Sequence, residues 1–481
     1  MDRFTEQVIA AARRRGANYC DCRLIELERE EIAVMNGALR ALTQASQRGF
    51  GVRVIVDGAW GFSSSSVTSD GEIDRIVDEA VLIARASASV KKRDVVLAPT
   101  GVYEDLVPHQ AARDPFTVPD GLKVELLVEA TRAMQIPGVV MARGQMQFSR
   151  ERKTFASSEG SYIIQDRIES GAGIKAIAAD DKGGVQVRSY PMSLSGDSAQ
   201  AGWEFVEAMD LVTHAEPTAR EAVALLTAKP CPSGVKDLVV GGQQMALQIH
   251  ESCGHPTELD RVMGMEASFA GTSFLTTDKK GTFQYGSPHV NLTADPTIPH
   301  ALGGLVYDDE GVRGRKVYLV QNGIFKHYLN SRASAPVVGE EPMGAMRADG
   351  FSRCPIVRMV SINIEPGMAS FDELVGGIDD GILVDGIKSW SIDDRRLNFQ
   401  FGSEIGWEIR GGKLQEMLRN PTYTGIAYEF WRSCDAVGDA SQYHVWGVDN
   451  CGKGEPMQVA HVSHGTSPAR FRQVRVGVLD E

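Results

Sequence analysis

The chain has 481 residues and a formal net charge of −13, with 43% hydrophobic and 23% charged residues. This length is too great for one typical hydrophobic core, so two or three domains are expected. The acidic balance argues against non-specific nucleic-acid binding, which needs a basic surface. No apolar run is long enough to cross a membrane, and residues 1–15 lack the apolar core of a signal peptide. We therefore expect a soluble protein of the cytoplasm.

The seven cysteines form no regular ladder, and an odd number makes a disulfide framework a poor interpretation. Cys20 and Cys22 are separated by one residue in a strand-like run, where alternate side chains face the same way. We expect them to be a buried, reduced pair rather than a metal or redox site. Reduced thiols also fit a cytoplasmic location.

Residues 1–95 predict an N-terminal α+β domain with a largely antiparallel sheet. Phe4, Val8 and Ala11 recur at helical spacing, and a second amphipathic helix is expected from about Asp70. Four short strands are expected between these helices. The dipeptide Asn36-Gly37 predicts a hairpin turn between two of them. The expected strands span residues 19–26, 31–35, 41–45 and 50–56.

Residues 96–229 predict a second, central α+β region. Its first part, to residue 117, is rich in turn-forming residues and is expected to be a surface linker. A helix is expected over 120–135, a meander of strands over 139–179, and another helix that starts at Pro217. The Pro and Gly residues from 230 to 234 indicate the next boundary.

Residues 230–481 predict a strand-rich, barrel-like antiparallel domain. The strand Leu238–Val240 leads through Gly241-Gly242 into a helix, and hairpin turns are expected at Asn322-Gly323 and Gly411-Gly412. The fold class is therefore α+β throughout, with antiparallel sheets and amphipathic helices first and a β-rich domain last.

The predicted helix of this last domain ends in His250-Glu251-Ser252-Cys253-Gly254-His255. Imidazoles bind zinc, and a carboxylate beside the metal can take a proton from water. The histidines are at i and i+5, which is roughly 140° round a regular helix, so a straight helix cannot aim both at one ion. Either a π-bulge adds a residue, or the helix ends before His255. Gly254 and Pro256 favour the second interpretation or a mixture of the two, with His255 swinging in from the break.

Two histidines leave a catalytic zinc site incomplete, because such sites usually have three protein ligands. Local spacing does not choose the third ligand. Cys253 is the main rival within the motif, and Glu258 and Asp260 are either surface acids or groups that orient a ligand histidine. The remaining candidates are Cys231, Cys434, Cys451, His289, His300, His327, His444, His461 and His464.

The motif and several distant segments resemble the TldD/PmbA metallopeptidases, and specifically the TldD-type subunit that carries HExxxH. The resemblance covers nearly the whole chain and keeps the order of the motifs. Besides the metal motif it rests on Asn36-Gly37, Gly58 to Phe62, Tyr307 to Val312, Asn322-Gly323, Asn398 to Gly402 and Asn450 to Gly454.

The resemblance implies zinc bound by His250, His255 and Cys451, with Glu251 as the general base for peptide-bond hydrolysis. It implies short or unstructured polypeptide substrates, such as leader peptides or loosely folded regulators. It also implies a dimer, either of like chains or with a PmbA/TldE-type subunit that lacks the zinc motif. No nucleic-acid or membrane partner is expected. Two alternatives stay open: a non-catalytic scaffold that keeps a structural zinc, and a hydrolase of another amide bond.

Overall fold

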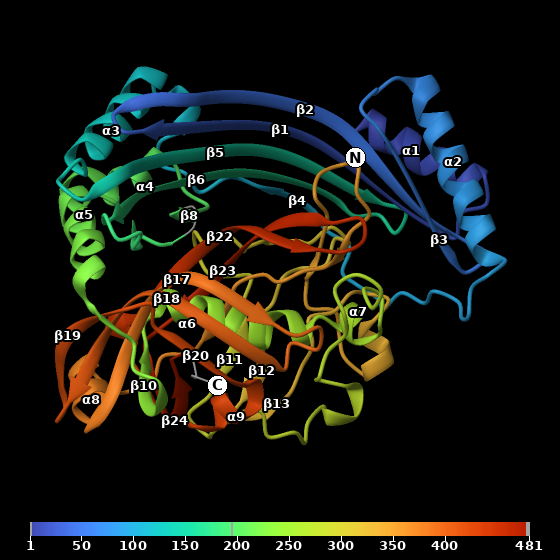
Figure 1. The fold of residues 1–481 in the computed structure, drawn as a ribbon. Helices are drawn as coiled ribbons and strands as arrows, with labels where there is room; N and C mark the ends of the chain where they lie inside the picture. Colours follow the sequence, from blue (N-terminus) through green and yellow to red (C-terminus); the bar gives the residue numbers. More distant parts are fainter. Residues whose placement is uncertain (1, 194–195, 478–481) are drawn as a thin grey trace.

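Four long antiparallel strands form an arched sheet from the N-terminal half of the chain. β1 (Tyr19–Met35) pairs with β2 (Ala38–Val56) and β5 (Val139–Ser157), and β5 pairs with β6 (Tyr162–Ala179). Figure 1 shows these strands curving over the C-terminal half. The computed structural model describes residues 2–193 and 196–477. Shorter strands complete the sheet: β3 (Ala59–Ser65), β4 (Glu104–Val107), β7 (Val185–Tyr190) and β8 (Asp197–Ala199).

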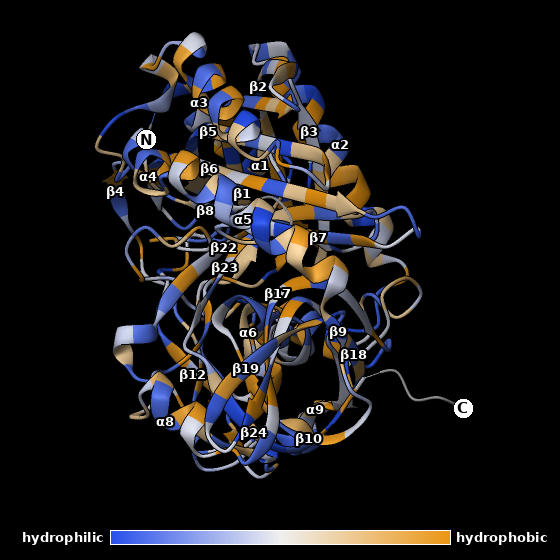
Figure 2. Ribbon diagram, turned by 60° about the vertical axis from the view of Figure 1, so that its left-hand side comes forward, coloured by the Kyte–Doolittle hydropathy of each residue, from blue (hydrophilic) through white to orange (hydrophobic). Residues whose placement is uncertain are grey.

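The four short strands expected from the sequence are two long ones. The charged stretch from Glu26 to Glu31 stays extended because β2 and β5 pair with it on both sides. Its polar side chains are either exposed or, like Glu30, paired with a buried cation. The predicted turn is confirmed, since Asn36 and Gly37 have φ values of 51° and 73°, which a tight hairpin requires. Figure 2 shows hydrophilic and hydrophobic residues following one another along the arch.

Helices pack against both ends of the arch. α1 (Arg3–Arg14) and α2 (Asp70–Ala88) lie at one end, and α1 begins where Asp2 caps the amide of Thr5. No helix of the described residues is long and apolar enough to span a bilayer. At the opposite end of the arch from α1 and α2 lie three more helices: α3 (Asp120–Ala133), α4 (Trp203–Ala208) and α5 (Leu211–Thr227).

The expected start of the last of these helices at Pro217 is wrong. α5 begins at Leu211, and Pro217 lies inside it. Proline removes one backbone hydrogen bond from a helix. Burial of Leu211 and Ala215 in the core at this end of the arch compensates for that bond, because fully burying a Leu side chain contributes about 1.5–3 kcal/mol.

The C-terminal half is built on a closed barrel, as the sequence predicted. β17 (Asp380–Ile392), β10 (Gly234–Val240), β24 (Ala469–Val476), β20 (Thr422–Ile426) and β18 (Asn398–Arg410) pair in that order, and β18 pairs back onto β17. All these pairs are antiparallel except β10 with β17. β9 (Lys229–Pro230), β19 (Lys413–Arg419), β21 (Cys434–Val437), α8 (Phe371–Gly376) and α9 (Ala427–Arg432) surround it.

Smaller sheets pack beside the barrel. One consists of β13 (Ile324–Phe325), β12 (Val317–Gln321), β11 (Leu292–Ala294) and β16 (Ile362–Ile364). A second is the pair β14 (Met346–Arg347) and β15 (Ile356–Val357). The third is a two-stranded ribbon of β22 (His444–Lys453) and β23 (Gln458–Thr466). This ribbon lies between the arch and the helix that follows β10 (Figure 1).

That helix, α6 (Gly242–Ile249), is buried in the centre of the C-terminal half. Met245 and Ile249 have no exposed surface, as expected for the apolar side of the helix. Gln244 and Gln248 are also buried, and both form hydrogen bonds with the Tyr423 hydroxyl on the barrel strand β20. Burial of these amides is possible because each has a polar partner. The barrel therefore fixes the helix whose C-terminal end carries the histidines.

Buried ion pairs join the arch to the C-terminal half. Asp309 accepts from Lys153 of β5 at 2.7 Å and pairs with Arg23 of β1 at 3.4 Å. Arg53 of β2 likewise pairs with Glu310 at 3.2 Å. Burial raises the pKa of Asp309, but the charges of Lys153 and Arg23 outweigh burial and hold its pKa at about 2. The two halves are thus connected through ionised groups that are shielded from water.

Replacing Asp309 with asparagine should lower the stability of the whole chain by about 2 kcal/mol at pH 7, because its pKa lies about two units below the unfolded value. A depressed carboxyl pKa stabilises above the unfolded pKa of 3.8, and this contribution is lost as the pH falls toward 2. Thermal melting should therefore show a large difference from wild type at pH 7 and a smaller one at pH 3. Glu216→Gln, in the exposed pair with Arg220, is the matched control and should change stability by less than about 0.5 kcal/mol.

Candidate metal centre

The two histidines of the motif lie on one side of a π turn. His250–Gly254 continues α6 with one extra residue in the turn, and the His255 amide donates to the His250 carbonyl. An i→i+5 bond stacks residues five apart, as an α-helix stacks residues four apart. A clean break before His255 is wrong, because His255 keeps helical angles of −59° and −42° despite Pro256, but the expected mixture is found: the π turn passes into a 3-10 turn at His255–Thr257. Gly254 is needed for packing, since a Cβ there would lie 2.0 Å from Met359 Sδ.

His464 of β23 orients His250. The Ile362 carbonyl can only accept, so His464 donates to it through Nδ1 at 3.1 Å. The Nε2 atom of His464 is then an acceptor, and it receives a hydrogen bond from Nδ1 of His250 at 2.8 Å. This chain of bonds leaves the lone pair of His250 on Nε2. Burial keeps the pKa of His464 well below its usual value, so His464 stays neutral and can accept.

Glu258 orients the second histidine in the same way. Nδ1 of His255 lies 2.9 Å from Glu258 Oε2, which leaves Nε2 of His255 as the atom free to bind a metal. Glu258 is fully buried. It is balanced by Lys453, whose ammonium lies 3.6 Å from Glu258 and 2.6 Å from Asp260. Neither residue is a surface acid: Glu258 contacts His255, whereas Asp260 is buried and bonds to Lys453 and to the Val357 amide.

The ribbon brings Cys451 to the histidines. The donor atoms of His250, His255 and Cys451 all lie within 4.8 Å of one another, and Cys451 Sγ is 3.9 Å from His255 Nε2. Arg358 donates to the Cys451 carbonyl, and Lys453 holds the same strand to Asp260. A buried cation on the ribbon and buried acids after His255 therefore draw together segments that are 196 residues apart in the chain.

The electrostatics of Cys451 and His255 suit metal binding. Burial raises the pKa of the Cys451 thiol, but the neighbouring His250 and His255 and the Arg358 guanidinium outweigh it and hold this pKa well below its usual value. Burial lowers the pKa of His255 to about 4, so this imidazole is neutral at pH 7. Burial also lowers the pKa of His250, but the Cys451 thiolate raises it by more. Thiolate and neutral imidazole are the forms that bind zinc.

The cluster opens onto a cavity of about 260 Å³ that also contains Glu251 and Arg396. Two imidazoles and one thiolate with an open side match the three-ligand pattern of catalytic zinc sites. Burial raises the pKa of Glu251, but His255, His250 and Arg396 lower it by more, so this carboxyl is ionised at neutral pH. The residues present therefore fit a metal ion, which His250, His255 and Cys451 would hold beside the Glu251 carboxylate.

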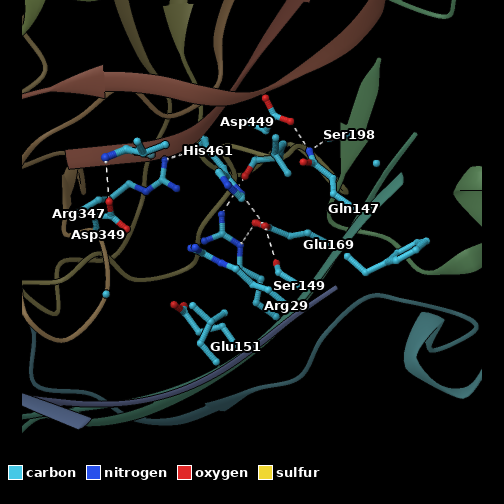
Figure 3. Close-up of a pocket in the computed structure, with 18 of the residues that line it drawn as sticks. Arg29, Gln147, Ser149, Glu151, Glu169, Ser198, Arg347, Asp349, Asp449 and His461 are labelled. Carbon is cyan, nitrogen blue, oxygen red and sulfur yellow. Dashed lines mark hydrogen bonds and ion pairs between the residues drawn. The ribbon is translucent and has the colours of Figure 1, made fainter. Parts of the chain in front are cut away.

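The rival ligands lie elsewhere in the part of the chain that the structure describes. Cys253 is buried in the hydrophobic core, and burial raises the pKa of its thiol. His461 donates through Nδ1 to Glu169 at 2.7 Å in a separate cavity of about 330 Å³ beneath the arch (Figure 3). Cys20 and Cys22 are buried, as expected. The remaining candidates outside the three-residue cluster are Cys231, Cys434, His289, His300, His327 and His444.

Two contributors to the site were not foreseen as such. His464 was one of several histidines without an assigned place, and its spacing from the motif carries no signal because β23 is distant in sequence. Arg396 carries no signal in the sequence for a place at this site. It belongs to a turn between β17 and β18 with a run of charged residues, which normally indicates a solvated loop. Only the closed barrel brings this turn to Glu251.

Comparison with known families covers most of the chain. Models of the PmbA/TldA metallopeptidase domain 1, central domain and C-terminal domain match residues 20–84, 113–229 and 233–478. The three models match in the order domain 1, central domain and C-terminal domain, and the last match includes the histidine motif and the ribbon.

Individual relatives agree with the family models. A metalloprotease of Methanothermobacter thermautotrophicus is 30% identical over 95% of both chains. A zinc metalloprotease TldD homolog of Saccharolobus solfataricus is 24% identical over 98% of both. The structure of TldE from Thermococcus kodakarensis has the same fold, with a TM-score of 0.75 and 18% identity over 99% of this chain and 100% of that one. The chain described here belongs to the PmbA/TldD family of metallopeptidases.

Proposed function

We propose that this metallopeptidase is a zinc-dependent enzyme in which His250, His255 and Cys451 hold the metal and Glu251 is the general base. The observation that carries the proposal is the convergence of the three donor atoms at the wall of a cavity that also contains Glu251. The homologue named as a zinc metalloprotease supports zinc as the metal. The reaction is hydrolysis of a peptide bond.

The side chains divide the chemistry between them. Zinc held by this set supplies a Lewis acid that activates water and polarises the scissile carbonyl. Glu251 is bound through Oε2 by Arg396, and its other oxygen has no hydrogen-bond partner among the described residues. That oxygen takes the proton of the attacking water and passes it to the leaving amine. His464 and Glu258 keep the ring orientations constant during these steps.

A structural zinc in a non-catalytic scaffold is the weaker alternative. Structural zinc sites are usually closed by four protein ligands. The described residues supply three, and Cys253, which a closed site could recruit as a fourth ligand, lies in the core. A closed site also has no use for a buried carboxylate facing it, whereas hydrolysis does.

The substrates we propose are short or unstructured polypeptides. The cavity beside the cluster holds only a few residues, so a folded domain does not enter it. Cys451 lies on a ribbon of two strands, and an extended peptide can add to a strand edge through backbone hydrogen bonds. Recognition of the backbone rather than side chains gives broad sequence tolerance.

We further propose that the chain works as a dimer, with a second copy or a TldE-type subunit. The TldE structure with the same fold supports a partner of this architecture. The arch also has an uncovered edge, since every residue from Ala38 to Arg48 of β2 is exposed and β3 pairs only from Phe50 onward. Long open strand edges in natural proteins are usually covered or blocked. A partner chain is a natural cover for this edge.

The zinc content of two cysteine variants should show which of the two candidate thiols is the ligand. Cys451→Ala should lose most of its zinc, because a thiolate ligand is removed from a three-ligand site. Cys253→Ala is the matched control: it alters a buried cysteine two residues from Glu251 without touching the cluster, and zinc content should stay at wild-type level. Metal content of the purified proteins by mass spectrometry decides the matter, and the reverse outcome would make Cys253 the ligand.

Exchange of Glu251 for glutamine should keep zinc bound but reduce peptide cleavage by about 10²–10⁴-fold, the usual contribution of a general base. The amide keeps the shape of the side chain but cannot accept the proton. Glu340→Gln, a buried glutamate that pairs with His327 and Lys280 away from the site, should retain full activity. Cleavage at the wild-type rate by zinc-loaded Glu251→Gln would exclude Glu251 as the base.

The same peptide segment should be cut when it is disordered and spared when it lies within a stable fold. An extended backbone is required for strand addition, and a folded segment already uses its backbone bonds. Mass spectrometry of digests of a small domain and of its permanently unfolded variant tests this. Equal cleavage of both forms would contradict the proposed substrate class.

A further inference from the structure

Arg396 occupies an unusual position beside Glu251. It lies in the turn between β17 and β18 with φ of 61°, in the left-handed region that side chains other than glycine rarely adopt. Residues held in this region carry conformational strain and concentrate at functional sites. The neighbouring Arg395 is exposed at the surface of the same turn. The strained position therefore directs one of two adjacent arginines into the cavity.

The guanidinium of Arg396 is only partly satisfied by the protein. Its Nη1 donates to Oε2 of Glu251, which is its one acceptor among the described residues. Its Nε is buried and has no hydrogen-bond partner. The side chain as a whole keeps 18% of its surface exposed, and it lines the cavity with His250 and Cys451. An arginine has five N–H donors, so most of its donors remain unused.

The unused donors have the geometry of a carboxylate site. Nε and Nη2 lie on the same edge of the guanidinium, and this edge can bind both oxygens of a carboxylate at once. The other walls of the cavity are mostly apolar and include Leu247, Ile387 and Val448, with the exposed Trp390 and one polar side chain, Asn450. An ionic contact is stronger in such surroundings than in water. A buried donor without a partner is also costly, which favours a partner that arrives with the ligand.

We propose that Arg396 binds a carboxylate of the peptide substrate, so that the enzyme prefers peptides with a negative group close to the scissile bond. This inference rests on the proposed peptidase function and names its substrate class. The carboxylate enters from the cavity onto the exposed part of the guanidinium, and a small side-chain rotation adds Nε as the second donor. The group comes either from the C-terminus of a peptide or from an Asp or Glu side chain. A local cation is needed here because the net charge of −13 repels acidic peptides elsewhere.

The test uses two matched pairs of disordered peptides. One pair differs only in a terminal carboxylate or carboxamide, and the other only in Glu or Gln beside the cleaved bond. Wild type should show a kcat/KM about tenfold or more higher for the charged member of at least one pair, the ratio expected for a charged hydrogen bond. The pair that shows the ratio identifies the source of the carboxylate.

Arg396→Gln should reduce that ratio to about one, whereas Arg395→Gln, the same change on the exposed neighbour, should leave it unchanged. Arg396→Lys should restore part of the ratio, because it keeps the charge but not the two-donor edge. A wild-type ratio near one would overturn the proposal. So would equal slowing of all four peptides in Arg396→Gln with the ratio kept, because that would mean Arg396 serves only to orient Glu251.

Equilibrium binding of the same peptides separates this inference from the proposed function. Tryptophan fluorescence of the zinc-loaded protein should show tighter binding of the charged peptides, lost in Arg396→Gln and kept in Arg395→Gln. If no peptide is cut but this pattern holds, the peptidase assignment fails and the carboxylate site stands. If peptides are cut but charged and uncharged peptides bind equally well, the carboxylate site is rejected and the peptidase proposal stands.

Discussion

The hydrogen bond from the His255 amide to the His250 carbonyl is the constraint on which the site depends. It forces one π turn at the end of α6, and that single turn converts a spacing of five residues into two rings on the same side of the helix. The contacts that the other residues of the centre make with the two rings depend on this geometry. His464 and Glu258 each bind the Nδ1 atom of one ring, and Cys451 approaches the Nε2 side. A regular helix would have separated the two rings by roughly 140°.

Buried charge connects this turn to the rest of the molecule. Lys453 on the ribbon lies among Glu258, Asp260 and Glu266, so the strand that carries Cys451 is tied to the segment that follows His255. Buried ion pairs contribute little net stability, but breaking one is strongly destabilising. Such a network therefore serves placement better than stability. Asp309 likewise fixes the arch to the C-terminal half through its ion pairs with Lys153 and Arg23.

The same region also contains unfavourable features. Arg396 adopts a strained backbone conformation, and its Nε is buried without a partner. A protein shaped for stability alone would have a glycine at such a turn and a satisfied donor. These costs collect within the cavity that Glu251 shares with the cluster. The carboxylate site that we propose beside Glu251 accounts for both features.

Local patterns in the sequence were enough for the α+β class, the hairpin at Asn36-Gly37, the barrel-like C-terminal half and the helix after Gly241, because turn chemistry and hydrophobic periodicity act over a few residues. They also marked His250, Glu251 and His255 as a unit, whereas Cys451 was reached only through family resemblance. The boundaries near residues 95 and 229 stay predictions. The length of the β1 strand, the π turn, the partner of His250 and the place of Arg396 depended on the folded chain. Each results from contacts between segments tens to hundreds of residues apart, and such contacts override local preference without leaving a local signal.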